Sequence, residues 1–446
     1  MRPCAATPLT VAPAVRICLS MTYRMHIRSW YADTANPHPE HPALDGAATC
    51  DVCVVGGGYT GLMTALELAE RGYDVVLLEA ERVGWGASGR NGGQVITGFN
   101  KSMGEIERRV GRDDARKLWD LGEEAKALLR DRVERHGIRC SLTSGFVLAA
   151  LKDRHLAELA DLEREMRDGY GYTGLEWLDR EGVARLVGAK GYVGGLFDSG
   201  SGHLHPLNYA LGLADACLAA GVRIFEGSRV LRIDRGPAPE VVTAQGRVRA
   251  RFLVLAGNAY LGPLVPELAA RVMPVGTYII ATEPLGAERA LSLLPQDVAV
   301  SDMNFVLNYF RRTPDHRLLF GGGVSYSGQD LPGVEQALRR KMLRVFPQLE
   351  GVRVAHFWGG RVAITANRLP HVGRLTPTIY FAHGYSGHGV ALSGIAGQVI
   401  AEAVAGTAER FDVFARIPHM AFPGGPGLRT PTLVLAMLWF RLRDLL

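Results

Sequence analysis

Residues 51–79 read DVCVVGGGYTGLMTALELAERGYDVVLLE, and this stretch decides the fold. The short apolar run at 52–55 predicts a strand, and apolar residues between 62 and 69 recur at the spacing of one helical face. A second apolar run at 75–78 predicts another strand. A strand, a glycine-rich turn, a helix and a parallel strand together make a dinucleotide-binding unit.

The glycines and the acidic residue of this unit have separate tasks. Gly56 makes the turn, Gly58 lets the backbone approach a pyrophosphate, and Gly61 lets the helix pack closely on the strand. The pyrophosphate would rest on the free N–H groups at the positive end of the helix. Glu79 is placed to accept hydrogen bonds from both ribose hydroxyls, and its charge would repel a 2′-phosphate, which argues against NADP. The predicted contacts are Gly56, Gly58, Tyr59, Thr60, Gly61, Glu79 and Ala80.

Length and composition narrow the class of protein. A chain of 446 residues should hold two or three domains, and 47% hydrophobic with 21% charged residues is typical of a soluble globular protein. A net charge of +5 is mild at this length, and Lys and Arg form no dense run, so nucleic-acid binding is not predicted. Six scattered cysteines do not form a disulfide framework, which favours a cytoplasmic setting.

Cys50-x-x-Cys53 resembles a redox or metal pair in its spacing. It enters the first predicted strand, where residues three apart are separated by roughly 10 Å. A disulfide requires Cα atoms within about 7 Å. We therefore interpret both cysteines as small residues that pack within the strand.

The two ends of the chain are expected to lie outside the main fold. Residues 1–45 read as an irregular arm, of which 1–20 match neither a signal peptide nor a membrane span and are expected to be disordered or untranslated. Residues 419–446 are predicted as a C-terminal tail helix. Its apolar run at 433–440 is too short to span a bilayer, so docking on the body or on a partner subunit is favoured over membrane contact.

A second glycine-rich segment follows Glu79 at residues 83–94. Its glycines and small polar residues do not support a stable helix or strand, but they let backbone N–H groups reach a flat polar ligand. FAD extends beyond its pyrophosphate and needs such a cradle, whereas a plain NAD enzyme rarely does. A mobile surface loop is the alternative. The predicted cofactor contacts here are Ser88, Gly89, Arg90, Asn91, Gly92, Gly93 and Gln94.

The middle of the chain alternates between helical and strand-like patterns. Residues 103–136 have a helical period, with Lys126 among the charges on the outer face and Leu128 and Leu129 inward. Residues 263–355 carry strand-like runs that predict an inserted antiparallel sheet, one wall of a substrate pocket. The other predicted helices are 154–166, 207–220 and 334–346, and the strands are 144–151, 222–225, 230–233, 252–256, 278–282, 305–311 and 317–320.

The last informative stretch, YFAHGYSGHGVA at 380–391, predicts a strand, a glycine-rich turn and a helix that continues to Val404. The start of this helix is a second positive pole, where negative charge on a reduced flavin could rest. His383 and His388 have no carboxylate or cysteine beside them, so no metal site is predicted. The predicted strand 252–256 ends in AGNAY at 256–260, small residues that suit a strand end beside the first glycine-rich turn, where a dinucleotide crosses the carboxyl edge of the sheet. The cofactor contacts predicted from these segments, and from the strand at 230–233, are Val230, Ala256, Gly257, Gly384, Gly387, His388, Gly389 and Val390.

These motifs together resemble the FAD-dependent D-amino-acid oxidase/glycine oxidase family, and within it the gamma-glutamylputrescine oxidase-like members. The likeness covers about residues 28–446, and its more particular motifs are SGRNGGQ at 88–94, WGGR at 358–361 and the HGYSGHG turn. It implies an α/β fold, with a Rossmann-type (GR2-like) FAD-binding domain and an inserted antiparallel-sheet α+β substrate domain. The domains expected are 46–100, 192–262 and 356–418 for FAD, and 101–191 and 263–355 for substrate.

The resemblance also implies oxidation of a C–N bond. A neutral amine gives a hydride from its α-carbon to flavin N5, and water hydrolyses the imine to an aldehyde and ammonia. The expected substrate is gamma-glutamylputrescine or a related ω-amino compound, and the alternatives are sarcosine, glycine or a D-amino acid. Pocket candidates are Tyr309, Trp358 and Arg361, together with Arg311, whose fork would hold a carboxylate unless that arginine is structural.

Two departures from the family concern the electron acceptor and the flavin link. Some relatives place a lysine above the flavin to activate oxygen, but after Lys152 the sequence has only Lys190 and Lys341, and neither falls on a predicted pocket strand. The natural electron acceptor is therefore either oxygen, as in an oxidase, or another molecule, as in a dehydrogenase. No cysteine follows Cys217, which excludes a thioether near the C-terminal flavin turn but not a histidyl link.

Two other classes of protein share the dinucleotide turn. A flavoprotein that modifies or senses RNA should carry a basic stripe, which the sequence does not contain. A catalytically inactive structural homologue would lose the yellow colour of flavin on purification. The substrate and the oligomeric state are not determined by the sequence.

Overall fold

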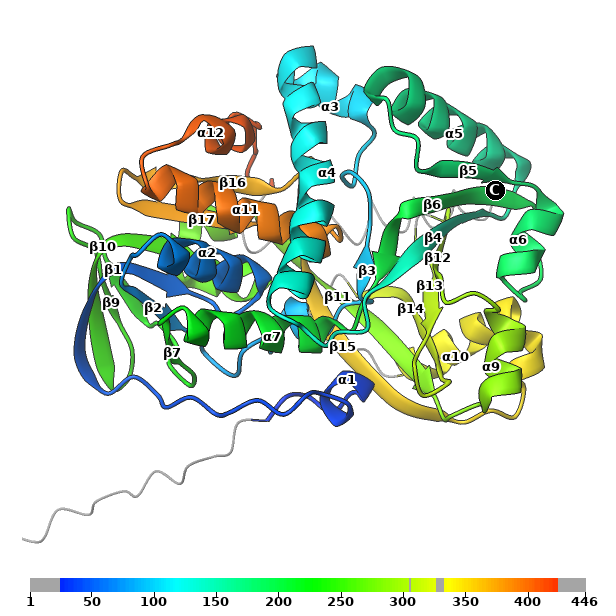
Figure 1. Ribbon diagram of the computed structural model, residues 1–446, viewed down its shortest axis with the longest axis horizontal. Helices are drawn as coiled ribbons and strands as arrows, with labels where there is room; N and C mark the ends of the chain where they lie inside the picture. The colour runs from blue at the N-terminus through cyan, green and yellow to red at the C-terminus, as the bar shows by residue number, and fades with distance from the viewer. Residues whose placement is uncertain (1–24, 305, 326–332, 424–446) are drawn as a thin grey trace, which may run out of the picture.

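The computed structural model describes residues 25–304, 306–325 and 333–423 (Figure 1). Two β-sheets, each with its own helices, form the left and right halves of the view in Figure 1. The predicted disorder of residues 1–20 lies outside the described residues. Of the predicted tail helix, residues 419–423 are not helical and the remainder lies outside them as well.

The first sheet contains the dinucleotide-binding unit. Its central pairs, from β17 through β10, β1 and β2 to β7, are all parallel, and β16 adds an antiparallel edge. The strands in spatial order are β16 (His371–Thr376), β17 (Ile379–His383), β10 (Gly246–Leu255), β1 (Gly46–Val55), β2 (Val75–Leu78) and β7 (Arg223–Phe225). Strands β8 (Arg232–Asp234) and β9 (Glu240–Val242) pair with each other, and β9 extends onto β10.

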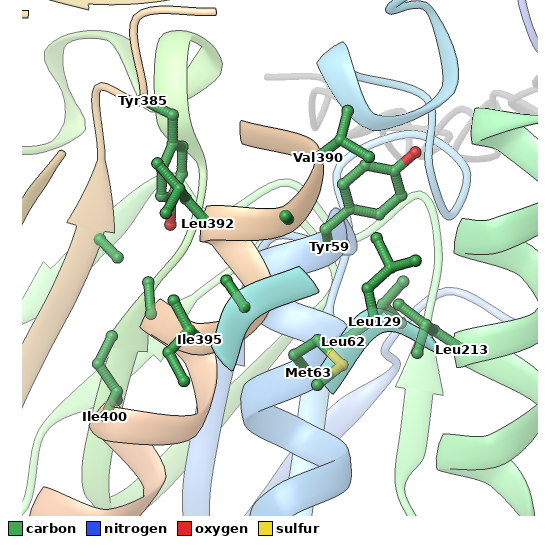
Figure 2. Packing of buried hydrophobic residues seen from close by; sticks show 14 of the residues in the cluster. Tyr59, Leu62, Met63, Leu129, Leu213, Tyr385, Val390, Leu392, Ile395 and Ile400 are labelled. Carbon is green, nitrogen blue, oxygen red and sulfur yellow. The ribbon is translucent and has the colours of Figure 1, made fainter. Parts of the chain in front are cut away.

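The apolar runs of the sequence explain why this sheet is parallel and central. Residues 52–55 of β1 and all four residues of β2 are buried, as strands covered on both faces require. Helix α2 (Tyr59–Glu70) contacts both α7 (Pro206–Ala219) and α11 (Gly389–Val404). In Figure 2, Leu62 and Met63 of α2 lie in the same cluster as Leu129 and Leu213.

The second sheet is antiparallel except for one parallel pair, β4 with β12. Its main path runs β15 (Val354–Thr365), β11 (Val272–Thr282), β14 (Leu318–Ser325), β13 (Tyr309–Arg312), β12 (Ala299–Asp302), β4 (Thr143–Ala150), β6 (Gly194–His203) and β3 (Gln94–Val95), and β5 (Leu175–Leu178) pairs with β6. Its core includes Phe310 of β13, whose ring centroid lies 5.9 Å from that of Phe320 in β14 and 4.9 Å from that of Phe346 at the end of α10.

The remaining helices connect or cover the two sheets. They are α1 (Trp30–Asp33), α3 (Met103–Val110), α4 (Arg112–Arg135), α5 (Asp153–Arg164), α6 (Arg180–Leu186), α8 (Pro266–Ala269), α9 (Ala287–Leu293), α10 (Val334–Val345) and α12 (Glu409–Ala415). A π-helical turn, Glu165–Gly169, extends α5, and 3-10 turns occur at Ala87–Gly89, Asn258–Tyr260, Gly262–Leu264 and Pro347–Leu349. The arm was expected to be irregular, but its described part, residues 25–45, contains the short helix α1.

Two local predictions were wrong. Lys126 was expected on the outer face of its helix, but it is 3% exposed, and its Nζ donates to Thr97 Oγ1 at 2.5 Å and pairs with Glu123 at 2.8 Å. The loop after Glu79 was expected to lack regular structure, but it contains a 3-10 turn and ends in β3. Thr97 for Lys126, and strand β6 for β3, supply contacts from distant parts of the sequence.

The limits of several strands also differ from those predicted. Strand β8 begins at Arg232 rather than at residue 230, and β13 begins at Tyr309, whereas position 305 lies outside the described residues. Strands β6 and β15 pair into the second sheet, although the sequence assigned 192–262 and 356–418 to the FAD domain. We propose that the domain boundaries lie just after these two strands. Cys50 and Cys53 lie within β1 as free thiols.

Candidate functional site

The turn between β1 and α2 admits no side chain at two of its glycines. Gly56 has a φ of +114°, and a Cβ there would lie 2.8 Å from the carbonyl oxygen of Ala256, at the end of β10. A Cβ on Gly61 would lie 1.9 Å from the carbonyl oxygen of Gly56. The first turn of α2 is therefore packed directly against the glycine-rich turn.

A serine from the second glycine-rich segment contacts the start of α2. The N-cap residue Gly58 has no side chain to satisfy the first N–H groups of the helix. Ser88 Oγ accepts a hydrogen bond from the backbone N–H of Tyr59 at 3.0 Å. The two segments that were predicted to hold the cofactor are thus joined in space.

Glu79 lies at the end of β2, where the sequence analysis expected a ribose partner. Its Oε2 accepts from the backbone N–H of Gly57 at 2.7 Å, and its Oε1 accepts from that of Glu81 at 2.9 Å. Burial raises the pKa of this carboxyl group, while the two N–H donors act in the opposite direction. The carboxylate is thereby fixed beside the turn, and hydrogen bonding to a ribose stays a prediction.

The loop between residues 85 and 94 is held by its own side chains. Asn91 Nδ2 donates to the carbonyl oxygens of Ala87 and Ser88 at 3.0 and 3.1 Å, and its Oδ1 accepts from Gly93 N at 2.7 Å. Arg90 Nε donates to the carbonyl oxygen of Trp85 at 2.6 Å, and its guanidinium carbon lies 3.8 Å from the centre of the indole ring. This stacking holds the positively charged guanidinium of Arg90 against the loop.

The HGYSGHG turn connects β17 to α11 next to the first helix. The hydroxyls of Tyr385 and Thr60 are 2.7 Å apart, and Gly384 N donates to Asn258 Oδ1 at 3.0 Å. Helix α11 has no side-chain cap at its N-terminus, and burial lowers the pKa of its N-cap residue His388 to about 4. The first N–H groups of α11 therefore remain available beside a neutral imidazole at pH 7.

A cavity of about 1040 Å³ connects these segments, at the upper end of the range for small-molecule and cofactor sites. It lies at the carboxyl ends of β1, β2 and β10, the usual place for a ligand in an open parallel sheet. The predicted cofactor residues that line it are Gly56, Gly58, Tyr59, Thr60, Glu79, Ala80, Ser88, Arg90, Asn91, Val230, Ala256, Gly257, Gly387, Gly389 and Val390.

The other predicted cofactor residues lie behind this lining. Gly61 is packed on the turn, and Gly93 is next to the carbonyl oxygen of Leu204. Gln94 begins β3 and donates through Nε2 to the carbonyl oxygen of Val300 at 3.2 Å. The residues of this group are Gly61, Gly89, Gly92, Gly93, Gln94, Gly384 and His388.

The far wall of the cavity comes from the second sheet. Trp358 is 2% exposed, and its indole Nε1 donates to the carbonyl oxygen of Arg90 at 3.1 Å. The rings of Tyr278 and Phe357 stack with centroids 5.8 Å apart, and Phe357 is 37% exposed. Arg361 also lines this wall with an exposed side chain, while its backbone N–H donates to Tyr260 Oη at 3.2 Å.

Tyr309 and Arg311 do not line the main cavity. The ring of Tyr309 lies against Gly92 and Gly321, in a separate small hollow. Arg311 is 3% exposed, and its guanidinium donates to the carbonyl oxygens of Gly92 and Leu204. These bonds support the structural alternative for Arg311, because its fork is engaged within the protein.

Several residues of the site were not predicted from the sequence. The cavity is also lined by Ile27, Arg28, Trp85, Asn258, Tyr260, Tyr278, Phe357 and Tyr385. Asn258, Tyr260 and Tyr385 belong to motifs that were already recognised, so their polar side chains were a usable signal. Ile27 and Arg28 belong to the N-terminal arm, for which no sequence pattern indicated a role.

The described residues contain neither a metal centre nor a membrane-spanning helix. Within 25–304, 306–325 and 333–423, no group of three or more His, Cys, Asp or Glu residues could hold a metal ion. His383 contacts His371, with Nε2 and Nδ1 2.8 Å apart, and does not line the cavity. In the same residues, no helix combines the length and the apolar character needed to cross a bilayer.

The chemistry of the cavity fits FAD. Its β-sheet end offers the N-terminus of α2 and the carboxylate of Glu79, which suit a pyrophosphate and a ribose. Its other end offers the uncapped N-terminus of α11 and the aromatic wall, which suit the pyrimidine and the flat rings of a flavin.

Comparisons with known proteins agree with this fit. The family model described as FAD dependent oxidoreductase (DAO) matches residues 51–403. The gamma-glutamylputrescine oxidoreductase of Escherichia coli (strain K12) is 46% identical over 420 residues, which cover 94% of this chain and 98% of that protein. The probable oxidoreductase OrdL of Haemophilus influenzae is 42% identical, covering 96% of this chain and 99% of its own.

Solved structures support the fold. The crystal structure of glycine oxidase from Geobacillus kaustophilus superposes with a TM-score of 0.69 at 23% identity, covering 80% of this chain and 95% of that one. At this identity the likeness concerns the fold alone. It agrees with the α/β architecture of a dinucleotide-binding sheet joined to a second, largely antiparallel sheet.

Proposed function

Because this chain belongs to the family of FAD-dependent oxidoreductases, we propose that it oxidises the primary amine of gamma-glutamylputrescine or of a related ω-amino compound. Bound FAD supplies a hydride acceptor at flavin N5. In the proposed reaction the α-carbon of the neutral amine loses a hydride and the nitrogen loses a proton. Water then hydrolyses the imine to an aldehyde and ammonia. The observation that carries the proposal is the 46% identity, over nearly the full length, to gamma-glutamylputrescine oxidoreductase.

The charge of the cavity supports a substrate that carries a carboxylate. Arg90 and Arg361 both line the end of the cavity that the second sheet forms. A gamma-glutamyl group brings an α-carboxylate, which an arginine fork binds through two parallel hydrogen bonds. Arg361 is the proposed partner for this carboxylate, because its exposed side chain lies at the cavity wall.

The aromatic wall supports a substrate with an unbranched methylene chain. Tyr278 and Phe357, whose rings stack on each other, both line the cavity. Such surfaces bury methylene groups and lower the pKa of an amine that is desolvated against them, which favours the neutral form. Rate enhancement would then come mainly from holding the amine carbon about 3–3.5 Å from the hydride acceptor.

The proposed roles of the three pocket residues differ. Arg361 would bind the carboxylate, and Trp358 would shape the pocket while fixing the loop at Arg90. Tyr309 lies behind Gly92, so we propose that it supports the loop instead of contacting the amine. No lysine among the described residues lines the cavity. Because the lysine that activates oxygen in some relatives has no counterpart among the described residues of the cavity, we propose either oxygen or another molecule as the electron acceptor.

The test is an anaerobic titration of the purified protein, followed by its visible spectrum. Gamma-glutamylputrescine should bleach the oxidised-flavin band, whereas putrescine, which lacks the carboxylate, should do so only at much higher concentration. Glycine, sarcosine and D-alanine are the comparison substrates. Bleaching by one of these but not by gamma-glutamylputrescine would overturn the proposed substrate and leave the family unaffected. Admitting air afterwards reports whether oxygen reoxidises the flavin.

A further inference from the structure

The N-terminal arm places one tyrosine at the junction of the two halves of the site. Tyr31, in α1, is fully buried. Its ring centroid lies 5.1 Å from that of Trp358 and 5.0 Å from that of His205, both in edge-to-face geometry. Its hydroxyl oxygen accepts a hydrogen bond from Arg311 Nη2 at 3.2 Å. One side chain therefore contacts β15, β13 and the start of α7.

Arg311 connects Tyr31 to residues 85–94, which we call the cofactor loop. Arg311 Nε donates to the carbonyl oxygen of Gly92 at 2.9 Å, and Nη2 donates to that of Leu204 at 3.1 Å. This buried guanidinium donates to the carbonyl oxygens of Gly92, Leu204 and Arg312 and to the Tyr31 hydroxyl. A buried cation with neutral partners depends on each of them, because losing one leaves charge uncompensated.

Trp358 also connects Tyr31 to the cofactor loop. The indole edge of Trp358 packs on Tyr31, and its Nε1 donates to the carbonyl oxygen of Arg90 at 3.1 Å. Arg90 and Gly92 flank Asn91, whose side chain holds the 3-10 turn of the loop. Through Arg311 and Trp358, Tyr31 is therefore connected to the carbonyl oxygens on both sides of Asn91, which lines the cavity.

The arm itself is anchored, so that Tyr31 has a defined position. Ser29 caps α1 by accepting from the backbone N–H of Ala32 at 3.1 Å. Trp30 Nε1 donates to Asp315 at 3.2 Å, and the Thr34 hydroxyl lies 3.1 Å from His205 Nε2. The last two contacts join the arm to the turn between β13 and β14 and to the start of α7.

We propose that Tyr31 is a positioning residue for the cofactor loop. By fixing the carbonyl groups of Arg90 and Gly92, it keeps residues 88–91 in the shape that faces FAD. The N-terminal arm then contributes to FAD binding through Tyr31. The proposal rests on the FAD cofactor of the family and is independent of which amine is oxidised.

The test compares Tyr31→Phe, which keeps the ring, with Tyr31→Leu, which also removes the ring contact with Trp358. The measurements are the dissociation constant of FAD, from free flavin after dilution and ultrafiltration of holoenzyme, and the visible circular dichroism of bound flavin. We expect Tyr31→Phe to raise the dissociation constant about 3- to 10-fold, as for loss of one hydrogen bond. Tyr31→Leu should raise it further and change the dichroism band.

Tyr170→Phe is the matched control. Tyr170 is 6% exposed and donates to Glu107 Oε1 at 2.6 Å, away from the cavity, so this variant makes the same chemical change elsewhere. It should leave both flavin measurements unchanged. Arg311→Lys, which keeps the charge but cannot reach both carbonyl oxygens, should weaken FAD binding as Tyr31→Phe does. The proposal is overturned if Tyr31→Phe and Arg311→Lys match Tyr170→Phe in both measurements.

Discussion

The Ser88 hydroxyl accepts a hydrogen bond from the backbone N–H of Tyr59 at 3.0 Å, so that one glycine-rich segment caps the helix that follows the other. This is the role of an N-cap side chain, supplied from a distant part of the chain. We expect Ser88→Ala to lower the free energy of unfolding by about 1 kcal/mol, as for loss of a cap.

Urea unfolding of the holoenzyme measures this effect. Ser144→Ala, at an exposed position on β4, is the control and should change stability little. Equal stability of the two variants would mean that the contact between Ser88 and Tyr59 contributes nothing to the fold.

Gly61 cannot accept a methyl group. Because a Cβ at this position would lie 1.9 Å from the carbonyl oxygen of Gly56, Gly61→Ala must displace either α2 or the turn. We expect it to cost about 1–3 kcal/mol of stability, as for overpacking, and to impair FAD retention. Gly169→Ala is the control, since nothing lies within 4 Å of a Cβ there. Thermal unfolding and flavin content of both purified variants check this, and a yellow Gly61→Ala protein of normal stability would contradict it.

Arg361 is expected to recognise the carboxylate of the proposed substrate. Arg361→Gln should raise KM for gamma-glutamylputrescine roughly 10-fold or more with little change in kcat, because hydrogen bonds to charged groups contribute about 1.5–3 kcal/mol. KM for putrescine should change far less. Arg353→Gln is the matched control, because Arg353 is exposed, pairs with Glu283 and lies outside the cavity. Parallel rises of KM for both amines would exclude a carboxylate contact.

His205 should make stability depend on pH. Burial, helped by the charge of Arg311, lowers its pKa to about 3, and its Nδ1 accepts from the backbone N–H of Asn208 as the cap of α7. Because the pKa is lower in the folded than in the unfolded state, the unfolded chain binds more protons below about pH 6.5. Stability is therefore complete above that pH and falls as the pH drops towards 3, by roughly 2 kcal/mol at pH 5.

Urea unfolding at pH 5 and pH 8 measures this contribution. His205→Asn keeps a capping side chain without a titrating group, so it should reduce the difference between the two pH values. Around His205 lie Trp30, Tyr31, Thr34 and Arg311, of which only Arg311 is charged. An unchanged pH dependence in His205→Asn would assign the effect to other buried histidines.

The first sheet and its turn could be predicted from sequence because their signals are local. Residues 51–79 contain the strand, the turn, the helix and the next strand in one continuous run, and the structure places β1, α2 and β2 there. The carboxyl end of β10 beside Gly56 was also predicted, since small residues at a strand end mark a close approach. The FAD-dependent family was confirmed by the comparisons.

The rest could not be predicted, because it depends on contacts between distant residues. Helical period placed Lys126 outward, but Thr97 and Glu123 provide partners that make its burial possible. Strand pattern put Tyr309 in the pocket, yet the register of β13 directs its ring against Gly92. The aromatic pair Trp30 and Tyr31 carried no motif, and only the folded chain brings it to Trp358.

The strand order of the first sheet has a consequence for synthesis. Strand β10 pairs on one side with β1, which is made early, and on the other with β17, which begins at Ile379. While the ribosome translates the intervening second-sheet segments, β9 already pairs with residues 247–249 of β10, but residues 253–255 at its carboxyl end have no partner on that edge. A nascent chain that stops before residue 379 therefore exposes an apolar edge. Truncated products should aggregate or engage chaperones, whereas the full-length chain closes its own sheet.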